Sequence, residues 1–454
     1  MEKAEGQTLL RRLGLRESTA IVVGTIIGTG VFLKTAVMAQ QAGSPLWVLV
    51  AWLVAGGLSF TGALTYAELG TLFPRAGGEY VYLREAYGPL MGFLFGWTRF
   101  WIGSPGSIAA YGVGAATFMN GLVPLGGENH RTFVAIAIIA LFTALNCFSV
   151  AFGGKLQSVM TIIKIVMIIG LTLAIFGLGS GASWSHFQTP VGAGWHSWSG
   201  FGAAVLAALW AFDGWNNLPM AAGEVSDPGR NIPRALGFGM IVVLVIYASA
   251  NIAYFYALPF DEVIHSSSTL FRDALPVATK AAALALGAAA VGLLSAAFVF
   301  SALGAMNGSI LTGARVPYAM ARDGLFFKKL GEVSGATHVP IVAVVVQGVW
   351  ACVLAKSGSF DQLTDYVVFA SWIFYALVTS GLFVFRRRLP NAHRPYRTPG
   401  YPWLPIIFLI CSILLLANTL MTSPRESLIG LGFIVAGVPV YFAFVKWGRK
   451  ARPN

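Results

Sequence analysis

Twelve long apolar stretches dominate this chain of 454 residues. They lie near residues 18–39, 46–72, 88–119, 131–150, 156–179, 199–222, 234–258, 280–313, 339–356, 363–386, 402–421 and 428–446. A helix needs about 20 predominantly apolar residues to cross the hydrocarbon of a bilayer, and each stretch approaches or exceeds that length. Only 11% of the residues are charged, against about 25% in an ordinary soluble domain. The sequence therefore predicts an all-α integral membrane protein with twelve transmembrane helices.

The positive charges indicate which side each loop faces. The net charge of +12 would by itself suit a nucleic-acid partner. However, if the spans alternate after the N-terminal segment 1–16, most of the 30 lysines and arginines fall on the side of that segment. This is the bias of cytoplasmic loops. We expect a multi-pass protein of the cell inner (plasma) membrane with both termini cytoplasmic, a short C-terminal tail (448–454), and no nucleic-acid partner.

The chain offers little for catalysis or metal binding. Cys147, Cys352 and Cys411 lie in apolar stretches without metal-ligand spacing, and the six histidines are scattered. A membrane enzyme would need clustered nucleophilic, acidic or metal-binding groups, whereas the intramembrane charges here are isolated. A channel would need repeated filter residues, and none is evident. We expect no metal, no cofactor and no enzymatic activity, which leaves a carrier.

The first apolar stretch is interrupted by Gly24–Phe32, which holds three glycines at positions 24, 28 and 30. Glycine removes the steric bar to leaving helical geometry. Backbone groups freed at membrane depth are tolerated where protein or a polar cavity satisfies them, so a broken helix indicates a ligand site. The alternative is that Gly24 and Gly28 form a motif for close helix packing.

A second interruption shifts the balance toward a ligand site. The sixth stretch contains Trp210–Pro219, with an Asp, a Gly, two Asn and a Pro close together. It opens a second block of five spans (198–388), as the first interruption opens the first block (17–180), and residues 400–447 add two more spans. Paired breaks at matching positions of inverted repeats indicate the midplane site of a transporter.

Several motifs carry a family resemblance that extends over nearly the whole chain. They are Gly24–Phe32, Tyr66–Gly70, Pro74–Tyr80, Asn146–Val150, Phe212–Asn216, Gly223–Arg234, Tyr318–Gly324 and Arg394–Pro402. With them the chain resembles the amino acid–polyamine–organocation superfamily and, within it, the L-type amino-acid transporter family. The resemblance implies the leucine-transporter fold, with a 5+5 inverted repeat, broken helices 1 and 6, and two further helices. It also implies sodium-independent transport of L-amino acids by alternating access, often as exchange.

The resemblance bears on partners as well. Animal members of the family bond an ancillary glycoprotein through a cysteine between helices 3 and 4. Residues 120–131 contain no cysteine. The chain is therefore similar to the stand-alone bacterial members, and we expect no disulfide-linked ancillary subunit.

An amino-acid site needs an anion subsite beside a cation subsite. The amides of Gly28, Thr29 and Gly30, at the start of the outer half-helix, would bind the α-carboxylate, and the Thr29 hydroxyl would add a hydrogen bond. The α-ammonium would bind backbone carbonyls offered by the two breaks, at Ile26, Trp210, Phe212 and Asp213. The resemblance supports this division.

Trp210 matches the position of a family aromatic that closes over bound substrate as a gate. The alternative is an interfacial or packing tryptophan. Its neighbour Asp213 has two readings. It contacts substrate or a coupling proton, or it caps the half-helix that begins near Trp215.

Lys164 lies deep in the fifth span, where a charge is expensive and indicates function. The resemblance places it where sodium-driven relatives bind sodium, so its ammonium would act as a sodium-site substitute between helices 1, 5 and 8, or carry a coupling proton. The alternative is that it snorkels to an interface. Ser295 and Ser301 on helix 8 are its candidate neighbours.

Other charges are harder to place. Arg99 faces either the cavity or the outer vestibule, and Lys34 is expected near the outer end of the first span. Glu68, Glu79, Glu85 and Glu224 are expected to form inner-gate or loop ion pairs with cytoplasmic arginines, which can break in one state and form in another.

The small residues of the first break leave room, while Trp210 and Phe212 crowd the second. We therefore expect exchange of small neutral amino acids (Ala, Ser, Thr). The alternatives are proton-coupled symport and transport of large neutral or cationic amino acids.

Overall fold

The computed structural model describes residues 9–120, 122–188, 198–268, 270–271, 274–357, 360–422 and 424–450. The first eight residues of the predicted N-terminal segment and the last four of the predicted tail lie outside this part of the chain. The described residues form helices joined by short connections, and an isolated parallel bridge pairs Leu13 with Val225.

The helices follow one another along the chain with few gaps. In order they are α1 (Leu15–Ile26), α2 (Gly30–Ala42), α3 (Pro45–Leu72), α4 (Glu79–Tyr87), α5 (Pro89–Thr98), η1 (Arg99–Gly103), α6 (Ser104–Met119), α7 (Glu128–Leu145), α8 (Val150–Leu178), η2 (Trp184–Phe187), α9 (Trp198–Ala211), α10 (Asn217–Met220), η3 (Ala222–Glu224), α11 (Pro228–Ala257), α12 (Phe260–Ile264), α13 (Val277–Leu286), α14 (Ala289–Gly313), α15 (Arg315–Arg322), η4 (Lys328–Gly331), α16 (Ile341–Ser357), α17 (Phe360–Arg388), α18 (Trp403–Thr422) and α19 (Pro424–Lys450).

Nine helical segments within the described residues are long and apolar enough to cross a membrane. The other three predicted spans are helical but shorter or divided. The stretch 88–119 is divided into α5, the π-helical turn η1 and α6, the sixth span ends early at Ala211, and α16 has 17 residues. The prediction of a helical membrane protein is therefore confirmed, while the count of twelve spans stays a prediction.

One predicted span was wrong at its start. The stretch 280–313 is two helices, because the chain turns at Gly287, whose φ of 57° suits glycine. Residues 280–286 belong to α13, and the span itself is α14 followed by α15. Alanine-rich sequence hid the boundary, since apolar composition continues across the turn.

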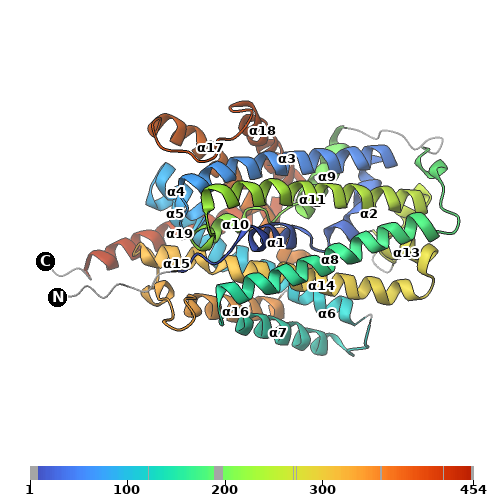
Figure 1. Ribbon diagram of the computed structural model, residues 1–454, viewed down its shortest axis with the longest axis horizontal. Helices are drawn as coiled ribbons and strands as arrows, with labels where there is room; N and C mark the ends of the chain where they lie inside the picture. The colour runs from blue at the N-terminus through green and yellow to red at the C-terminus, as the bar shows by residue number, and fades with distance from the viewer. Residues whose placement is uncertain are drawn as a thin grey trace.

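The helices form an elongated bundle (Figure 1). The chain that leads into α1 enters at the same end at which α19 finishes, beside α4, α5 and α15, and we call this the terminal end. The broken first span lies inside the bundle, with 83% of its apolar window buried, against 22% for α7, α18 and α19. The first interrupted span is therefore surrounded by protein, as freed backbone at membrane depth requires.

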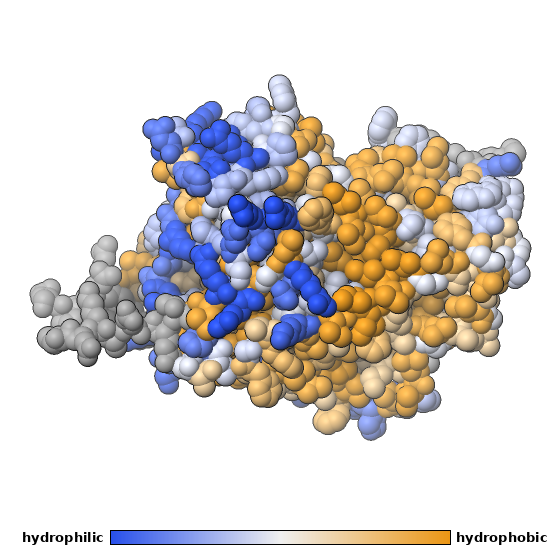
Figure 2. All heavy atoms as spheres, in the orientation of Figure 1, coloured by the Kyte–Doolittle hydropathy of each residue, from blue (hydrophilic) through white to orange (hydrophobic). Residues whose placement is uncertain are grey.

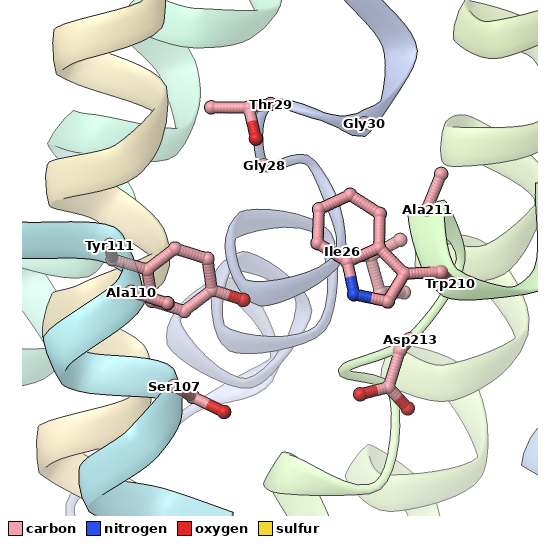
Figure 3. A pocket seen from close by; sticks show the side chains of 10 residues that line it. All are labelled: Ile26, Gly28, Thr29, Gly30, Ser107, Ala110, Tyr111, Trp210, Ala211 and Asp213. Carbon is pink, nitrogen blue, oxygen red and sulfur yellow. The ribbon is translucent and has the colours of Figure 1, made fainter. Parts of the chain in front are cut away.

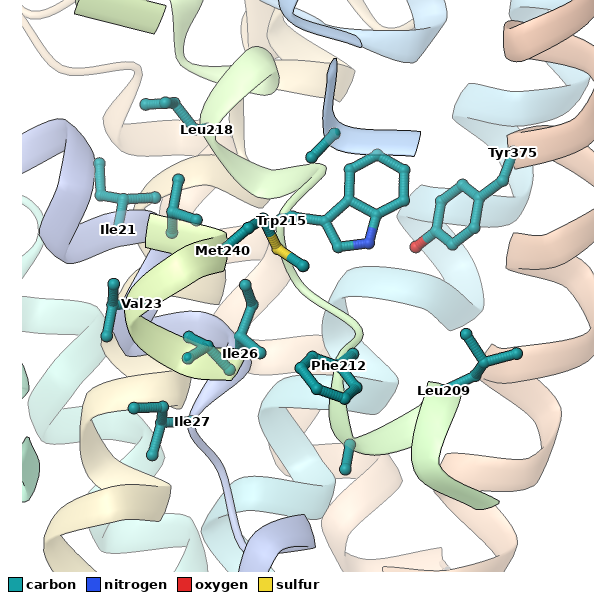
Figure 4. Packing of buried hydrophobic residues seen from close by; sticks show 14 of the residues in the cluster. Ile21, Val23, Ile26, Ile27, Leu209, Phe212, Trp215, Leu218, Met240 and Tyr375 are labelled. Carbon is teal, nitrogen blue, oxygen red and sulfur yellow. The ribbon is translucent and has the colours of Figure 1, made fainter. Parts of the chain in front are cut away.

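Both predicted interruptions are present. The helix stops at Ile26 and resumes at Gly30, and the later one stops at Ala211 and resumes at Asn217. Figure 4 shows the second break as a non-helical segment that passes Ile26, with Phe212 and Trp215 among apolar side chains. At each break the apolar side chains pack against neighbouring helices. The backbone N–H and C=O groups that lose their helical partners can then bond to other groups.

Candidate functional site

A pocket lies between the two breaks (Figure 3). Its lining comprises Ile26, Gly28, Thr29 and Gly30 from the first break, Trp210, Ala211 and Asp213 from the second, and Ser107, Ala110 and Tyr111 from α6. In Figure 3 the rings of Tyr111 and Trp210 stand on opposite sides, with Thr29 above and Ser107 and Asp213 below. Segments nearly 190 residues apart in sequence therefore share one small polar space.

Direct contacts fix the two breaks against each other. The Thr25 hydroxyl donates to the Gly214 carbonyl at 2.9 Å. The Tyr247 hydroxyl on α11 lies 3.0 Å from both the Ile26 and Ala211 carbonyl oxygens. Gly214 has a φ of 123°, and a Cβ there would lie 2.9 Å from the Thr25 carbonyl group. Only glycine allows this approach, so the geometry of the pocket depends on it.

The first break offers a polar surface suited to an anion. The Thr29 hydroxyl is buried and has no hydrogen-bond partner among the described residues. It precedes α2, where the Gly30 and Val31 amides find no acceptor among the described residues and carry partial positive charge, while the Phe32 amide donates to the Thr29 carbonyl at 3.2 Å. The Gly28 amide differs, because it already donates to the Ile26 carbonyl at 2.7 Å. The predicted carboxylate-binding residues are therefore brought together, with Thr29 and Gly30 the more available pair.

Fewer carbonyls are available than predicted. The Ile26 oxygen accepts from the Gly28 amide and the Tyr247 hydroxyl, and the Trp210 oxygen accepts from the Asp213 amide at 3.2 Å. The carbonyls of Phe212 and Asp213 receive no donor from the described residues. The sequence could not reveal this, because the competing donors come from the turns themselves and from α11.

The Phe212 side chain does not line the pocket. Its ring is buried, with centroids 5.8 Å from the Trp52 ring and 5.0 Å from the Tyr247 ring. The expectation that it crowds the substrate is wrong. Phe212 continues the last turn of α9, with its amide bonded to the Ala208 carbonyl at 3.1 Å, and this turn directs its ring toward α3 and α11.

Trp210 lines the pocket and contacts Lys34, which we expected near the outer end of the first span. The Lys34 ammonium lies 4.4 Å from the centre of the Trp210 ring. Lys34 is half-buried, one helical turn beyond Gly30 on α2. We did not predict this cation–π contact from the sequence. It links the ring of Trp210, the predicted gate, to α2.

Asp213 faces the pocket, and its predicted capping role is wrong. α10 begins at Asn217, with Asn216 at the N-cap and no side-chain capping hydrogen bond. The Asp213 carboxylate instead accepts a hydrogen bond from the Tyr375 hydroxyl of α17 at 2.8 Å. Asp213 is too far from the first helical turn because the break continues to Asn216 rather than ending at Trp215.

Lys164 is buried and fully engaged. Its ammonium donates to the carbonyls of Gly24 at 2.9 Å, Ile27 at 2.7 Å and Ser301 at 2.9 Å. The Ser301 hydroxyl in turn donates to the Ile27 and Gly28 carbonyls, both at 2.9 Å. The snorkelling alternative is wrong, since this side chain is 1% exposed. Ser295 is buried on α14, the helix of Ser301, but it provides none of the three carbonyls that accept from the Lys164 ammonium.

Arg99 is not among the residues that line the pocket. It sits on the π-helical turn η1 and donates to the Asn217 side chain at 2.8 Å, at the start of α10. Asn216 donates to the Glu79 carboxylate at 2.8 Å. Arg99 and Glu79 thus hold the two asparagines of the second break, so Glu79 is not one of the loop ion pairs that we expected.

The terminal end is closed by ion pairs. Glu224 and Arg315 form a buried bidentate pair, with distances of 2.7 and 2.9 Å. The Glu224 carbonyl also accepts from the Arg12 and Leu13 amides at 2.9 Å, which fastens the chain before α1.

Two further carboxylates form ion pairs at this end as expected. Glu68 binds Arg386 at 2.8 and 2.7 Å, with Arg394 at 3.3 Å. Glu85 pairs with Arg84 at 2.7 Å and Arg75 at 3.0 Å. These pairs are more exposed on the arginine side than the Glu224 pair, so Glu224 is the most deeply buried link at this end.

Sequence reasoning missed four side chains that shape the site. Ser107 and Tyr111 share one face of α6, and Tyr247 and Tyr375 reach the breaks from α11 and α17. The i, i+4 spacing of Ser107 and Tyr111 within an apolar helix was the one available signal. Among the described residues, no group of three His, Cys, Asp or Glu side chains comes together to hold a metal ion.

Comparison with known proteins agrees with this geometry. A family model described as amino acid permease matches residues 13–445. The chain is 34% identical to the serine/threonine exchanger SteT of Bacillus subtilis (strain 168), over 98% of this chain and 99% of that protein. It is 33% identical to the b(0,+)-type amino acid transporter 1 of Rattus norvegicus, over 98% and 91%. It is 29% identical to the human cystine/glutamate transporter, over 98% and 87%.

These relatives are membrane transporters rather than enzymes, and they confirm the resemblance to amino-acid transporters of the amino acid–polyamine–organocation superfamily. With the pocket between two broken helices, the match over nearly the whole length places this chain in the amino acid permease family.

Proposed function

We propose that this chain is a sodium-independent exchanger of small neutral L-amino acids such as alanine, serine and threonine. The similarity to the serine/threonine exchanger SteT extends over 98% of this chain, which supports this substrate class. The observation that carries the proposal is the buried, unpartnered Thr29 hydroxyl beside the start of α2. A polar group left unsatisfied in a protein interior is costly, and a bound carboxylate would satisfy it.

The substrate lies between the breaks. Its carboxylate binds the Thr29 hydroxyl and the amides of Thr29 and Gly30, with the Gly28 amide joining if its turn opens. Its ammonium binds the Phe212 and Asp213 carbonyls. The pocket wall on the opposite side is formed by Tyr111, and Trp210 closes the outer side as the gate. The small space between two aromatic rings favours short side chains.

The Lys164 ammonium takes the place of the sodium ion that sodium-driven transporters bind. Its ammonium holds carbonyls of the first break and of α14 at 2.7–2.9 Å. A permanently attached cation at this place removes the need for sodium, which is why we propose sodium-independent exchange.

Alternating access follows from the closed terminal end. The fold that we propose has two inverted five-helix repeats, 17–180 and 198–388, with the spans of 400–447 added, in the inner (plasma) membrane with both termini cytoplasmic. In the opposite state the Glu224–Arg315 pair separates and the chain before α1 swings away, so substrate leaves toward the cytoplasm. No disulfide-linked ancillary subunit takes part.

The test is uptake of radiolabelled alanine into liposomes in sodium-free buffer. We expect saturable uptake when the vesicles contain serine or alanine, and little uptake into empty vesicles. If an inward proton gradient drives uptake into empty vesicles, the protein is a proton-coupled symporter rather than an exchanger. Absence of saturable uptake of alanine, serine and threonine by folded protein would refute the substrate assignment.

The Thr29 hydroxyl is tested by Thr29→Val against Thr29→Ser. A hydrogen bond to a charged group contributes about 1.5 kcal/mol, so Thr29→Val should raise KM for alanine roughly tenfold. Thr29→Ser keeps the hydroxyl and should leave KM near the parent value. Equal KM values for the two variants would remove this hydroxyl from the carboxylate site.

Asp213 favours a second candidate function, transport of cationic amino acids. Its carboxylate lines the pocket, where it accepts a hydrogen bond from Tyr375 and faces the space that a positively charged side chain would enter. Counterflow with arginine and with alanine separates the two. Asp213→Asn should abolish arginine exchange and spare alanine exchange if this second function holds.

A further inference from the structure

A surface groove lies far from the substrate pocket, between α3, α11 and the connection that precedes α18. Arg230 and Arg234 stand at its head, and Gly237, Phe238 and Ile241 continue it along α11, with Tyr396 beside them. We call these residues the α11 groove. The substrate mechanism uses none of them.

Neither arginine forms a strong ion pair with a carboxylate of the described residues. Arg230 has Asp227 as an ion-pair partner at 3.8 Å, and the side chains of this pair are 75% and 58% exposed. Such an exposed pair contributes little. Arg234 is exposed one turn further on, and no carboxylate of the described residues lies within ion-pair distance of it. Both guanidinium groups are therefore available to an anion, and the positive end of α11 adds to their field.

Beyond the arginines the same helix face is apolar. Phe238 is 58% exposed, Ile241 50% and Val245 60%. Gly237 opens the groove between them, since a Cβ at that position would meet no atom within 4 Å. From Arg234 to Val245 the helix rises about 16 Å, roughly half the thickness of the hydrocarbon core. The length and polarity match one acyl chain below one headgroup.

The face of the molecule drawn in Figure 2 has the same division. Figure 2 shows hydrophilic residues gathered over the terminal end and hydrophobic residues covering the middle of the face that α11 crosses. The α11 groove runs from the first region into the second. It therefore lies where the headgroups of one leaflet meet its acyl chains.

We propose that the α11 groove binds an anionic phospholipid. Its phosphate lies between Arg230 and Arg234, because guanidinium groups bind phosphate oxygens in pairs. One acyl chain lies over Gly237 against Phe238 and Ile241. Membrane leaflets rich in anionic lipid attract such basic groups by about 1 kcal/mol per charge.

Lipid at this place also bears on transport. α11 packs along α1 and α3, and it carries Tyr247, whose hydroxyl joins the two breaks. A lipid that fixes the first turns of α11 therefore fixes the element that holds the pocket. This second effect rests on the proposed exchange activity, whereas lipid binding itself does not.

The binding experiment is native mass spectrometry of the purified protein with phosphatidylglycerol or phosphatidylcholine. We expect the parent to retain one phosphatidylglycerol more tightly than phosphatidylcholine. Arg230→Gln with Arg234→Gln should lower that affinity about 30-fold, which corresponds to roughly 2 kcal/mol for two charges. Gly237→Phe should also displace the lipid while keeping both charges, because its ring fills the groove.

The matched control is Lys328→Gln with Lys329→Gln. These two exposed lysines lie on η4, away from α11, so their removal changes net charge equally and should leave phosphatidylglycerol retention unchanged. An equal loss in both double variants would reduce the effect to overall charge and overturn the site. Displacement of phosphatidylglycerol by inorganic phosphate together with undiminished retention by Gly237→Phe would assign the arginines to a free anion instead.

Alanine counterflow in phosphatidylcholine liposomes with and without phosphatidylglycerol measures the effect on transport. We expect the anionic lipid to accelerate the parent and not the arginine double variant. If no variant or parent exchanges amino acid at all, the proposed function fails while the mass-spectrometric result still decides lipid binding. Equal acceleration of parent and arginine variant would overturn the link between the groove and the pocket.

Discussion

The buried pair of Glu224 and Arg315 should determine how long the terminal end stays closed. Both side chains are at most 1% exposed, and two hydrogen bonds of 2.7 and 2.9 Å join them. Removing one partner of a buried pair costs about 3–5 kcal/mol, because the other charge is left without compensation. In the open state water would solvate both groups, so the cost falls on the closed state alone.

Glu224→Gln should therefore favour opening. The glutamine oxygen still accepts one hydrogen bond, so we take the lower limit of about 3 kcal/mol, which corresponds to a shift of more than 100-fold in the closed-to-open ratio. Leu13 reports this shift, because it is fully buried and paired with Val225 in the closed form. A Leu13→Cys reporter, in a background without Cys147, Cys352 and Cys411, should be alkylated far faster in the Glu224→Gln variant.

Glu85→Gln is the matched control. Glu85 lies at the same end, pairs with Arg75 and Arg84, and is 34% exposed. Exposed pairs contribute at most about 1 kcal/mol, so its loss should change the alkylation rate no more than about fivefold. Similar rates for the two variants, or a Glu224→Gln rate equal to that of the parent, would refute the argument that burial gives this pair control of the closed state.

Two other positions give sharp outcomes. Lys164→Met removes the ammonium that bonds three carbonyls at the first break and α14, of which only Ile27 keeps a second side-chain donor, the Ser301 hydroxyl. We expect counterflow to fall at least 100-fold, while Lys155→Met, exposed on the same helix, should retain activity. Comparable activity of the two variants would contradict a positioning role for Lys164. Gly214→Ala would push a Cβ against the Thr25 backbone at a φ of 123°, so the yield of folded protein should drop, whereas Gly202→Ala, which meets open space, should fold as the parent does in a thermal-shift assay.

The breaks themselves could be predicted from sequence, and their available groups could not. Glycines at 24, 28 and 30 and the polar cluster after Trp210 marked both interruptions, although Gly24 itself lies within α1, packed closely against α8, and Gly30 begins α2. Which carbonyls stay available depends on donors from elsewhere. Tyr247, 221 residues from Ile26, takes one of the predicted acceptors.

Asp213 and Lys34 show the same division. An acidic residue in a break is consistent with either a helix cap or a pocket contact. The structure excludes the cap because α10 begins only at Asn217. A lysine in an apolar stretch predicts a polar partner, and the Trp210 ring that it meets belongs to α9, in the other interrupted span. Neither choice is encoded within a few residues of the side chain concerned.

The sequence by itself determined that this chain is helical and membrane-embedded, where two of its helices break, and that a charged residue is buried at position 164. Those properties follow from hydrophobic length, backbone freedom and the cost of charge in lipid, which are local. The tertiary structure decided that Lys164 bonds three carbonyls, that Phe212 turns away from the pocket, and that Glu224 rather than Glu79 closes the terminal end. These outcomes depend on which distant groups meet, because a hydrogen bond or ion pair forms only within a few ångströms.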